Sequence, residues 1–409
     1  MQRIPIVERA DWRERAAQEG FLFHSLDGQP YWDETAYYAF TLKEIEDDLE
    51  GPTATVEAMC RELVARAITD EQTLKRLGIP QRFWNFIAAS WKRGDRSLYG
   101  RFDFRYDGNG PAKLLEFNAD TPTSVFETAV FQYGWLTDAA QRQIIPHDAD
   151  QFNSLHERLI EGWRILLEPR TSAGLRTLGP PELGTRAGVT ASPKVHFAGM
   201  LDNPEDAGTL AYLADTANQA GATTRLIQME KIGRNRKGLF VDEDETPIET
   251  AFKLYPWEWM FAEAFGASLP GASTRWIEPP WKAILSNKGI LPSLWAMFPR
   301  HPNLLPAFFE DDPNRSDLGN SYVIKPLHSR EGANVEIVVD GSIIEADDGP
   351  YRKEPKVVQA LAPLPVFDGN YTVLGSWFAA AGPAGLSVRE DIGPITRNTS
   401  RFLPHAIVG

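Results

Sequence analysis

The segment RFDFRYDGNGPAKLLEFN, residues 101–118, carries oxygen-bearing side chains at strand spacing. Alternation puts Arg101 and Asp103 on one face of a first strand, and Glu116 shares a face with Asn118 on a second. The DGNGP between them contains the Asp-Gly and Asn-Gly pairs that favour tight hairpin turns. If Asp103 lies opposite Glu116, then Arg101 lies opposite Asn118. This face suits Mg²⁺ beside phosphate oxygens, although an exposed face of charged cross-strand pairs would use the same residues.

A second group of candidates lies in the last third of the chain. SYVIKPLHSREGANVEIV predicts a strand carrying Lys325, a loop with Glu331 and Gly332, and another strand. A lysine at the end of an apolar strand can hold a nucleotide phosphate while amides of a glycine-containing loop cover it. Lys288 precedes this segment, and Gln359 follows it on KVVQALAPLP, a strand whose backbone edge could bind an adenine. Each lysine alone is ordinary, but the order is that of a nucleotide site.

These candidates must be positioned by other elements. Residues 1–95 are expected to be mostly helical, with two helices in 41–68 interrupted at Gly51-Pro52, and another helix is expected after Pro122. Residues 194–229 read as a strand, a helix capped by Asn203 and a second strand, which is a βαβ unit. Residues 238–255 are expected to form a hairpin with an acidic tip.

The loop after the first strand of the βαβ unit contains further candidates. Open α/β units bind ligands at the carboxyl ends of their strands, so Asp202 and Asp206 could meet a cation there. Acidic residues are also favoured in the first turn of any helix, which is the alternative explanation.

The composition restricts the class of protein. The chain has 409 residues, 43% of them hydrophobic and 24% charged, with a net charge of −14 and no basic cluster. Nucleic acid is therefore not an expected partner, whereas a cationic small molecule would be tolerated. The sequence contains none of the patterns G-x-x-x-x-G-K-[ST], G-x-G-x-x-G, G-x-S-x-G or H-E-x-x-H. Phosphate handling must use another scaffold.

The single cysteine and the apolar runs bear on location. Cys60 lies in VEAMCRELVARAI, whose spacing predicts an amphipathic helix and a buried thiol rather than a nucleophile. The first residues lack an apolar leader, and the run LGSWFAAAGPAGLSV is short and broken by Gly and Pro. We expect a cytoplasmic protein without a membrane span. The oligomeric state is left open.

Several long motifs together resemble one family. RFDF…EFNADTPTS, PWEWM, NKGILPSLW, VIKPLHSREGANV, VVQALAPLP and VREDIGPITRNTSRFLPH, in this order and over nearly the whole chain, resemble the synthetase domain of the glutathionylspermidine synthase family, which are ATP-grasp ligases. The resemblance implies an α/β fold, an ATP-grasp with permuted motif order. It implies a helical segment and metal-ligand hairpin in 1–130, a pre-ATP-grasp-like βαβ subdomain in 190–260, and an ATP-binding subdomain in 280–409.

The resemblance also implies roles for particular residues. Asp103, Glu116 and Asn118 would hold Mg²⁺, and Arg101 and Arg389 would contact the transferred phosphoryl group. ATP would be bound by a larger set from the last third of the chain: Lys288, Lys325, Glu331, Gly332, Gln359, Ala360 and Leu361. The substrate would be bound by Thr121, Thr123 and Ser124, with residue types in DTPTS that differ from those of the bifunctional enzymes. Asp202, in the loop of the βαβ unit, is a further candidate for the substrate.

The expected activity is an ATP-dependent carboxylate–amine ligase that forms an acyl phosphate, with a peptide-like acid and a polyamine-like amine as substrates. The bifunctional members carry an additional cysteine amidase domain, and amide hydrolysis is not expected here. Two alternatives remain: a nucleotide-binding scaffold that has lost activity, and a small-molecule kinase, which would need no amine.

Overall fold

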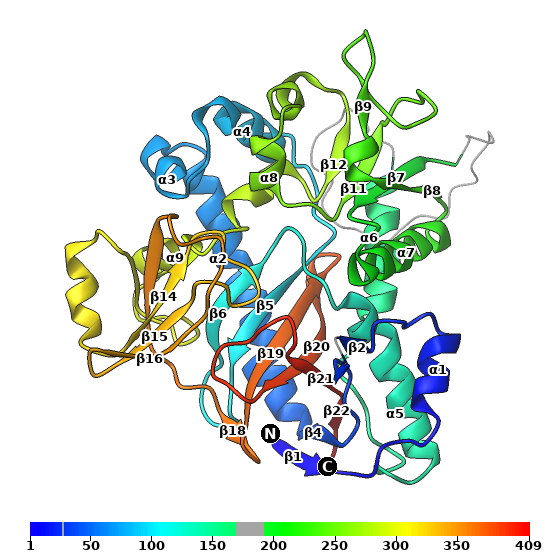
Figure 1. Cartoon of the computed structure of the whole chain (residues 1–409), viewed down its shortest axis with the longest axis vertical. Helices are drawn as coiled ribbons and strands as arrows, with labels where there is room; N and C mark the ends of the chain where they lie inside the picture. The colour runs from blue at the N-terminus through cyan, green and yellow to red at the C-terminus, as the bar shows by residue number, and fades with distance from the viewer. Residues whose placement is uncertain (27, 169–191) are drawn as a thin grey trace.

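The computed structural model describes residues 1–26, 28–168 and 192–409 as a mixed α/β fold. Figure 1 shows a central sheet, with a parallel sheet above it on one side, an antiparallel sheet beside it, and the two termini close together below. The α-helices are α1 (Trp12–Gln18), α2 (Gly51–Ala67), α3 (Glu71–Arg76), α4 (Trp84–Lys92), α5 (Gln132–Gln141), α6 (Leu155–Leu167), α7 (Pro204–Gln219), α8 (Trp257–Ala262) and α9 (Ile290–Met297). Short π- or 3₁₀-helical segments are η1 (Glu44–Glu50), η2 (Gln81–Phe83), η3 (Glu127–Phe131), η4 (Met229–Lys231), η5 (Gly266–Gly271), η6 (Pro280–Ile284) and η7 (Pro313–Leu318).

The central sheet joins segments that are far apart in the sequence. Its strands are β5 (Tyr99–Arg105), β6 (Lys113–Asn118), β18 (Val366–Phe367), β19 (Asn370–Ala379), β20 (Gly382–Asp391) and β21 (Arg401–Leu403). The order is β21-β20-β19-β5-β6, with β18 paired to β19 and every pair antiparallel. The expected 101–118 hairpin is β5–β6, and it is therefore extended by strands from the C-terminal part of the chain.

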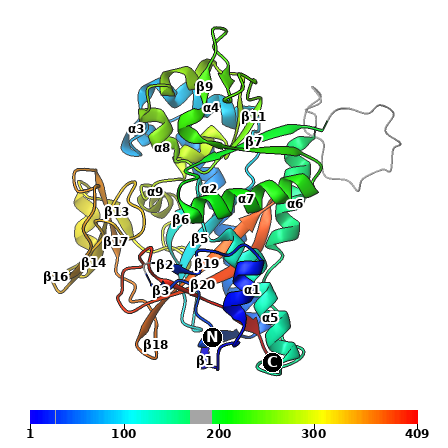
Figure 2. The same ribbon diagram turned by 45° about the vertical axis from the view of Figure 1, so that its right-hand side comes forward.

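A parallel sheet contains the predicted βαβ unit. Its strands are β7 (Lys194–Gly199), β8 (Thr223–Gln228), β11 (Thr250–Lys253) and β12 (Arg275–Ile277), in the order β12-β11-β7-β8. Helix α7 connects β7 to β8, and the Asn203 side chain accepts hydrogen bonds from the amides of Glu205 and Asp206, as the predicted cap requires. Figure 2 shows α7 lying across this part of the molecule beside α6.

An antiparallel sheet carries the second group of candidates. Its strands are β13 (Ala307–Phe309), β14 (Tyr322–Pro326), β15 (Glu336–Val339), β16 (Ser342–Ala346) and β17 (Lys356–Ala360), in the order β13-β17-β14-β15-β16. Strands β1 (Gln2–Pro5), β4 (Ala36–Phe40) and β22 (His405–Ile407) form a three-stranded sheet that joins the two ends of the chain. Two small hairpins are β2 (Ser25–Leu26) with β3 (Gln29–Pro30), and β9 (Gly233–Arg234) with β10 (Phe240–Val241).

Some expectations about the elements are wrong. The helical run in 41–68 continues through Gly51-Pro52 without a break: η1 ends at Glu50 and α2 starts at Gly51. Pro52 lies in the first turn of α2, a position that proline tolerates. The hairpin expected in 238–255 forms only around its acidic tip, where Val241 bridges Pro247 in antiparallel orientation and the Ile248 amide donates to the Phe240 carbonyl at 2.8 Å. It does not extend to residue 255, because β11 lies inside the parallel sheet. The N-terminal 40 residues contribute β1 and β4 as well as α1.

The main hydrophobic core lies between α2, α9 and the central sheet. Cys60 on α2 is fully buried in this core, as expected, and burial raises the pKa of its thiol. No helix of the described residues combines the length and the apolar character needed to span a bilayer.

Candidate active site

The β5–β6 hairpin has the register that its sequence predicts. Asp103 pairs with Glu116 and Arg101 with Asn118. The register shifts after Asp103, so that Phe104 pairs with Leu114 and Leu115 is left without a partner. A bulge of this kind frees a backbone group from the ladder. The Leu115 carbonyl accepts a hydrogen bond from Lys325 Nζ at 2.9 Å, which brings β14 to the hairpin.

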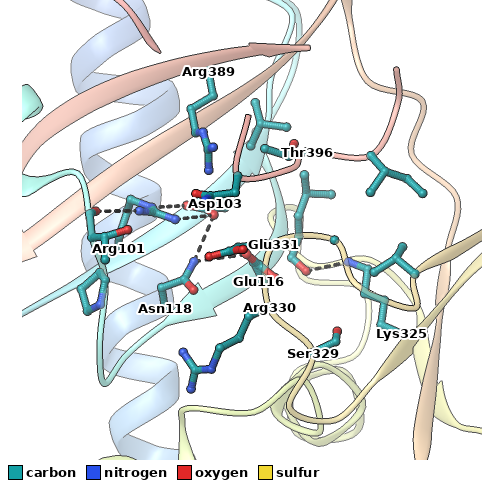
Figure 3. Close-up of a pocket in the computed structure, with 18 of the residues that line it drawn as sticks. Arg101, Asp103, Glu116, Asn118, Lys325, Ser329, Arg330, Glu331, Arg389 and Thr396 are labelled. Atoms are coloured by element: carbon teal, nitrogen blue, oxygen red, sulfur yellow. Dashed lines mark hydrogen bonds and ion pairs between the residues drawn. The ribbon is translucent and has the colours of Figure 1, made fainter. Parts of the chain in front are cut away.

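The polar side chains of the hairpin converge on one point. Arg101 binds Asp103 with two hydrogen bonds, 2.7 Å from Nε to Oδ1 and 3.1 Å from Nη2 to Oδ2. Asn118 Nδ2 lies between the two carboxylates, 3.0 Å from Asp103 Oδ2 and 3.2 Å from Glu116 Oε1. Figure 3 shows these four side chains together, with Arg389 pointing toward them from above and Lys325 lying to their right.

Close packing of the backbone gives Arg101 its position. A Cβ on Gly375 of β19 would lie 2.8 Å from Arg101 Cδ, so only glycine at that position leaves room for the arginine. Arg101 Nη1 also donates to the Thr123 carbonyl at 3.0 Å and to Ser124 Oγ at 3.2 Å. Ser124 is buried and adopts a φ of 67°, so its hydroxyl is directed at the arginine.

Two lysines face the carboxylates. Lys288 Nζ lies 3.1 Å from Glu116 Oε2 and donates to the Ser329 carbonyl at 2.5 Å. Burial acts to raise the pKa of Glu116, but Lys288 and Lys325 outweigh it and lower the pKa. Lys325 Nζ donates to Gln359 Oε1 at 2.8 Å, and burial lowers its pKa to about 8. Burial raises the pKa of Asp103 against the opposing effect of Arg101.

A cavity of about 1150 Å³ opens over this hairpin. Sixteen of the seventeen candidates from the sequence line it: Arg101, Asp103, Glu116, Asn118, Thr121, Thr123, Asp202, Asp206, Lys288, Lys325, Glu331, Gly332, Gln359, Ala360, Leu361 and Arg389. The exception is Ser124, which lies behind Arg101. Gln359 is on the lining, but its side chain is held by Lys325 and by the Leu114 carbonyl, at 3.0 Å from Nε2.

The loop after β14 closes one side of the cavity. Gly332 has a φ of 76°, and a Cβ there would lie 2.5 Å from Ile395 Cγ2 and 2.8 Å from the Thr396 carbonyl oxygen. Glycine is therefore required where this loop meets residues 395–396. Arg389 enters from β20 and donates from Nη2 to the Arg397 carbonyl at 2.6 Å. Its Nε is buried without a hydrogen-bond partner in the part of the chain that the structure describes, so the arginine keeps a donor for a ligand.

Arg330 is a site residue that the sequence did not single out. It donates from Nη1 to Thr121 Oγ1 at 3.0 Å and from Nη2 to Glu258 Oε1 at 2.7 Å. It thereby joins the loop after β14 to the DTPTS segment and to α8. The sequence contains one local indication of this role. Arg330 is a basic residue between Ser329 and Glu331, in the loop that was expected to cover a phosphate.

An acidic group at the N-terminus of α7 was also largely missed. The Tyr31 hydroxyl donates to Glu127 Oε1 at 2.8 Å and lies 3.4 Å from Glu205 Oε1. Burial and the charge of Glu205 raise the pKa of Glu127 to about 8 and that of Asp206 to about 7. Tyr31, Glu205 and Asp206 line the cavity beside Asp202. These residues come from three separate parts of the sequence, and no local pattern connects them.

Two buried lysines fix the chain directly after β6. Lys253 Nζ lies 2.5 Å from Asp120 Oδ1, and the Trp257 amide donates to Asp120 Oδ2 at 2.8 Å. Lys282 Nζ donates to the Ala119 carbonyl at 2.7 Å. The turn that follows Asn118 is therefore attached to β11 and to the N-terminus of α8. Buried ion pairs of this kind specify geometry more than they add stability.

The donor chemistry of the hairpin fits a hard cation. Among the described residues, no group of three or more His, Cys, Asp and Glu side chains is placed to hold a metal. The hairpin instead offers two carboxylates and one carboxamide, which are ligands that Mg²⁺ accepts together with waters and substrate phosphates. The amide nitrogen of Asn118 now bridges Asp103 and Glu116, as a cation between two carboxylates would. Rotating the Asn118 carboxamide by 180° exchanges its oxygen and nitrogen, and the oxygen would then face a bound cation.

Comparison with known proteins gives a consistent result. Residues 3–408 match the family model described as glutathionylspermidine synthase preATP-grasp. A Haemophilus influenzae protein provisionally named an acid–amine ligase is 38% identical, over 98% of this chain and 98% of its own length. The bifunctional glutathionylspermidine synthetase/amidase of Escherichia coli is 23% identical over 91% of this chain, and the match spans 60% of that enzyme.

One more relative and one solved structure extend this result. Trypanothione synthetase of Crithidia fasciculata is 27% identical, and the match covers 83% of this chain and 52% of that protein. The solved structure of a glutathione synthetase-like effector from Globodera pallida aligns with a TM-score of 0.53 at 14% identity, covering 97% of this chain and 95% of that one. That alignment supports the fold class only.

Proposed function

Because this chain belongs to the glutathionylspermidine synthase family of ATP-dependent acid–amine ligases, we propose that it joins a peptide-like acid to an amine through an acyl phosphate. Its enzyme class is that of an ATP-dependent ligase forming a carbon–nitrogen bond. The acid, the amine and the roles of the site residues are the proposed parts.

One observation carries the proposal. In a single cavity, the two carboxylates of the β5–β6 hairpin face cations from three other segments: Lys288, Lys325 and Arg389. Cations collected around carboxylates at a cavity of this size suit a phosphate chain accompanied by a metal. Lys325 also holds β14 to the hairpin, and a buried lysine with a lowered pKa on a cavity lining is typical of a functional site.

The nucleotide side of the cavity follows from this arrangement. Lys288 and Lys325 would bind ATP phosphates, with backbone groups of Glu331 and Gly332 covering them. Asp103, Glu116 and Asn118 would hold Mg²⁺, which when bound supplies positive charge to the phosphate oxygens. The adenine would lie along β17 near Ala360 and Leu361, where the lining is apolar.

The acid would bind beside Thr121 and Thr123, close to Arg101. Its carboxylate oxygen attacks the γ-phosphorus, ADP leaves, and negative charge gathers on the transferred oxygens. Arg101 and Arg389 would stabilise that charge, because both guanidinium groups are already oriented by buried partners and need no rearrangement. The amine nitrogen then attacks the acyl carbon, loses a proton and displaces phosphate.

The amine would bind beside the acidic group at the N-terminus of α7. Asp202, Glu205 and Asp206 line the same cavity, and Glu127 lies behind them with Oε2 lacking a hydrogen-bond partner among the described residues. Carboxylates that repel one another in a partly buried site are stabilised by a cation. The proposed amine is therefore one that is positively charged, as a polyamine is.

The test is to incubate the protein with Mg-ATP and pooled peptides and amines. We expect ADP rather than AMP, and a product lighter than acid plus amine by one water in mass spectrometry. Hydroxylamine should replace the amine and give a hydroxamate. Glu116→Gln should abolish turnover, while Asp107→Asn, which alters a carboxylate on the same hairpin that binds Arg105 outside the cavity, should not.

Two results would contradict the proposal. A phosphorylated acid that accumulates to the same level with and without amine would indicate a kinase. ATP affinity that is equal with and without Mg²⁺ in calorimetry would remove the assigned metal role.

A further inference from the structure

Large apolar side chains gather at the mouth of the cavity. Met200 is 45% exposed and Trp259 is 41% exposed, and both line the cavity together with Tyr255. Scattered exposed apolar residues are ordinary on any protein surface. Several that surround one cavity, next to convergent polar groups, are typical of a surface that a ligand covers.

The parallel sheet explains why these side chains meet. Ala198 of β7 pairs with Lys253 of β11, and Met200 and Tyr255 each follow two residues later at the carboxyl ends of these adjacent strands. The chain leaves β7 through α7 toward β8, and leaves β11 through α8 toward β12, on opposite sides. Such a divergence opens a crevice outside the strand ends, where open α/β sheets bind ligands.

The aromatic pair lies next to the proposed position of the acid. The rings of Tyr255 and Trp259 meet edge to face with centroids 5.3 Å apart. The Arg330 guanidinium lies 5.8 Å from the Trp259 ring centroid, and the same guanidinium donates to Thr121 Oγ1 at 3.0 Å. Thr121 is the first residue of the segment beside which the acid would bind. The Tyr255 and Trp259 rings therefore lie next to the proposed position of the acid.

Charge assigns the wall to the acid rather than to the amine. The amine would be drawn to the carboxylates Asp202, Glu205 and Asp206 at the start of α7. Around the Tyr255 and Trp259 rings the described lining has no carboxylate, and the neighbouring Glu258 lies off the lining with Oε1 bound by Arg330. At Met200 the wall adjoins the acidic group, because Asp206 is hydrogen-bonded to the Met200 backbone. Apolar surface at this place is stabilised only when a ligand removes it from water.

We propose that the acid substrate carries a large apolar side chain, aliphatic or aromatic, which packs against Met200, Tyr255 and Trp259. This inference rests on the proposed ligase function and specifies the class of its acid. The thioether of Met200 and the edge-to-face rings can accept either shape, since both are polarisable and Met is unbranched. A peptide acid with only small or polar side chains would leave the wall in contact with water.

The test compares tripeptide acids that are identical except for one side chain, which is Ala, Leu or Phe at each position in turn. Hydroxylamine serves as the amine, and both ADP and hydroxamate are measured. At one position, the Leu or Phe peptide should exceed the Ala peptide in kcat/KM by about tenfold or more, as a buried apolar group does in an enzyme pocket. Glutathione, which has no large apolar group, should resemble the Ala peptide.

Variants connect the preference to the wall. Met200→Ala and Trp259→Ala should bring kcat/KM for the Leu or Phe peptide down toward that for the Ala peptide measured with the same variant, and Trp259→Phe should retain the preference. Leu226→Ala is the matched control, because Leu226 is 43% exposed but lies on β8 away from the cavity lining. Equal kcat/KM for all peptides, or a preference untouched by both variants, would overturn the inference and leave the ligase function standing. No ADP with any acid would overturn both.

Discussion

Lys325 should make nucleotide binding depend on pH in a range where few lysines titrate. Its ammonium is buried against the Leu115 carbonyl and Gln359, and burial lowers its pKa to about 8. A phosphate chain binds the charged form. Below pH 8 the free protein already carries the proton, and above pH 8 a proton must be taken up on binding. Affinity is therefore present at neutral pH and is lost as the pH rises.

The magnitude follows from that pKa. At pH 9, one unit above it, about nine-tenths of the free protein carries a neutral Lys325. The dissociation constant for Mg-ATP should then be about tenfold larger than at pH 7, which corresponds to about 1.4 kcal/mol. At pH 7, replacing the lysine by methionine removes a charge-assisted hydrogen bond worth about 1.5–3 kcal/mol. Lys325→Met should therefore bind about 10- to 150-fold more weakly at pH 7.

The assay is isothermal titration calorimetry with a non-hydrolysable ATP analogue and Mg²⁺ between pH 7.0 and 9.5. Buffers of different ionisation enthalpy would count the protons taken up. Lys325→Met should show no rise in dissociation constant over this range. Lys92→Met, which changes an exposed lysine on α4, should behave as the unaltered protein.

Two outcomes would refute the reasoning. The first is an affinity that stays constant from pH 7.0 to 9.5 in the unaltered protein. The second is a pH dependence that persists in Lys325→Met, because another group would then be responsible. Circular dichroism would show whether the variant remains folded.

Three further predictions concern other parts of the structure. Arg389→Ala should lower kcat by about 100-fold or more with little change in the dissociation constant of ATP, because a donor directed at the transferred group acts in the transition state; comparable losses in both would argue against this role. The pKa of Asp206, raised to about 7 by burial and Glu205, means that it becomes charged as the pH rises through 7, so KM for a permanently cationic amine should fall between pH 6 and 8 and flatten in Asp206→Asn. Arg9→Met should lower the free energy of unfolding by about 3–5 kcal/mol, because it leaves the buried Glu34 carboxylate without its arginine. Denaturant unfolding measures this, and a loss below about 1 kcal/mol would contradict the prediction.

The hairpin shows how much the local sequence can predict. Period-two alternation and the DGNGP turn predicted the hairpin and allowed Asp103 to lie opposite Glu116, and the structure has this pairing. The position of the bulge at Leu115 was not predicted, because an extra residue in one strand is decided by what its carbonyl meets. Here it meets Lys325, more than 200 residues away in the sequence.

The part of the 238–255 prediction that is wrong has a similar origin. The acidic tip does reverse the chain, with Val241 bridged to Pro247, but the second strand does not pair with the first, because Ala251 and Phe252 are fully buried between β7 and β12. A strand buried on both faces of a parallel sheet gives an apolar run without alternation. Its partners are selected by the sheet as a whole and cannot be read from the segment itself.

By itself, the sequence determined the hairpin, the βαβ unit with its Asn203 cap, and the order of the lysine-bearing motifs, since each depends on residues that are neighbours along the chain. Only the tertiary structure decided that Tyr31, Glu127 and Glu205 form one acidic group, and that Met200 and Trp259 border one cavity. The physical reason is that these residues have no interaction with one another until the sheets are assembled. Their proximity comes from long-range packing of the core, to which the ring of Tyr31 itself belongs.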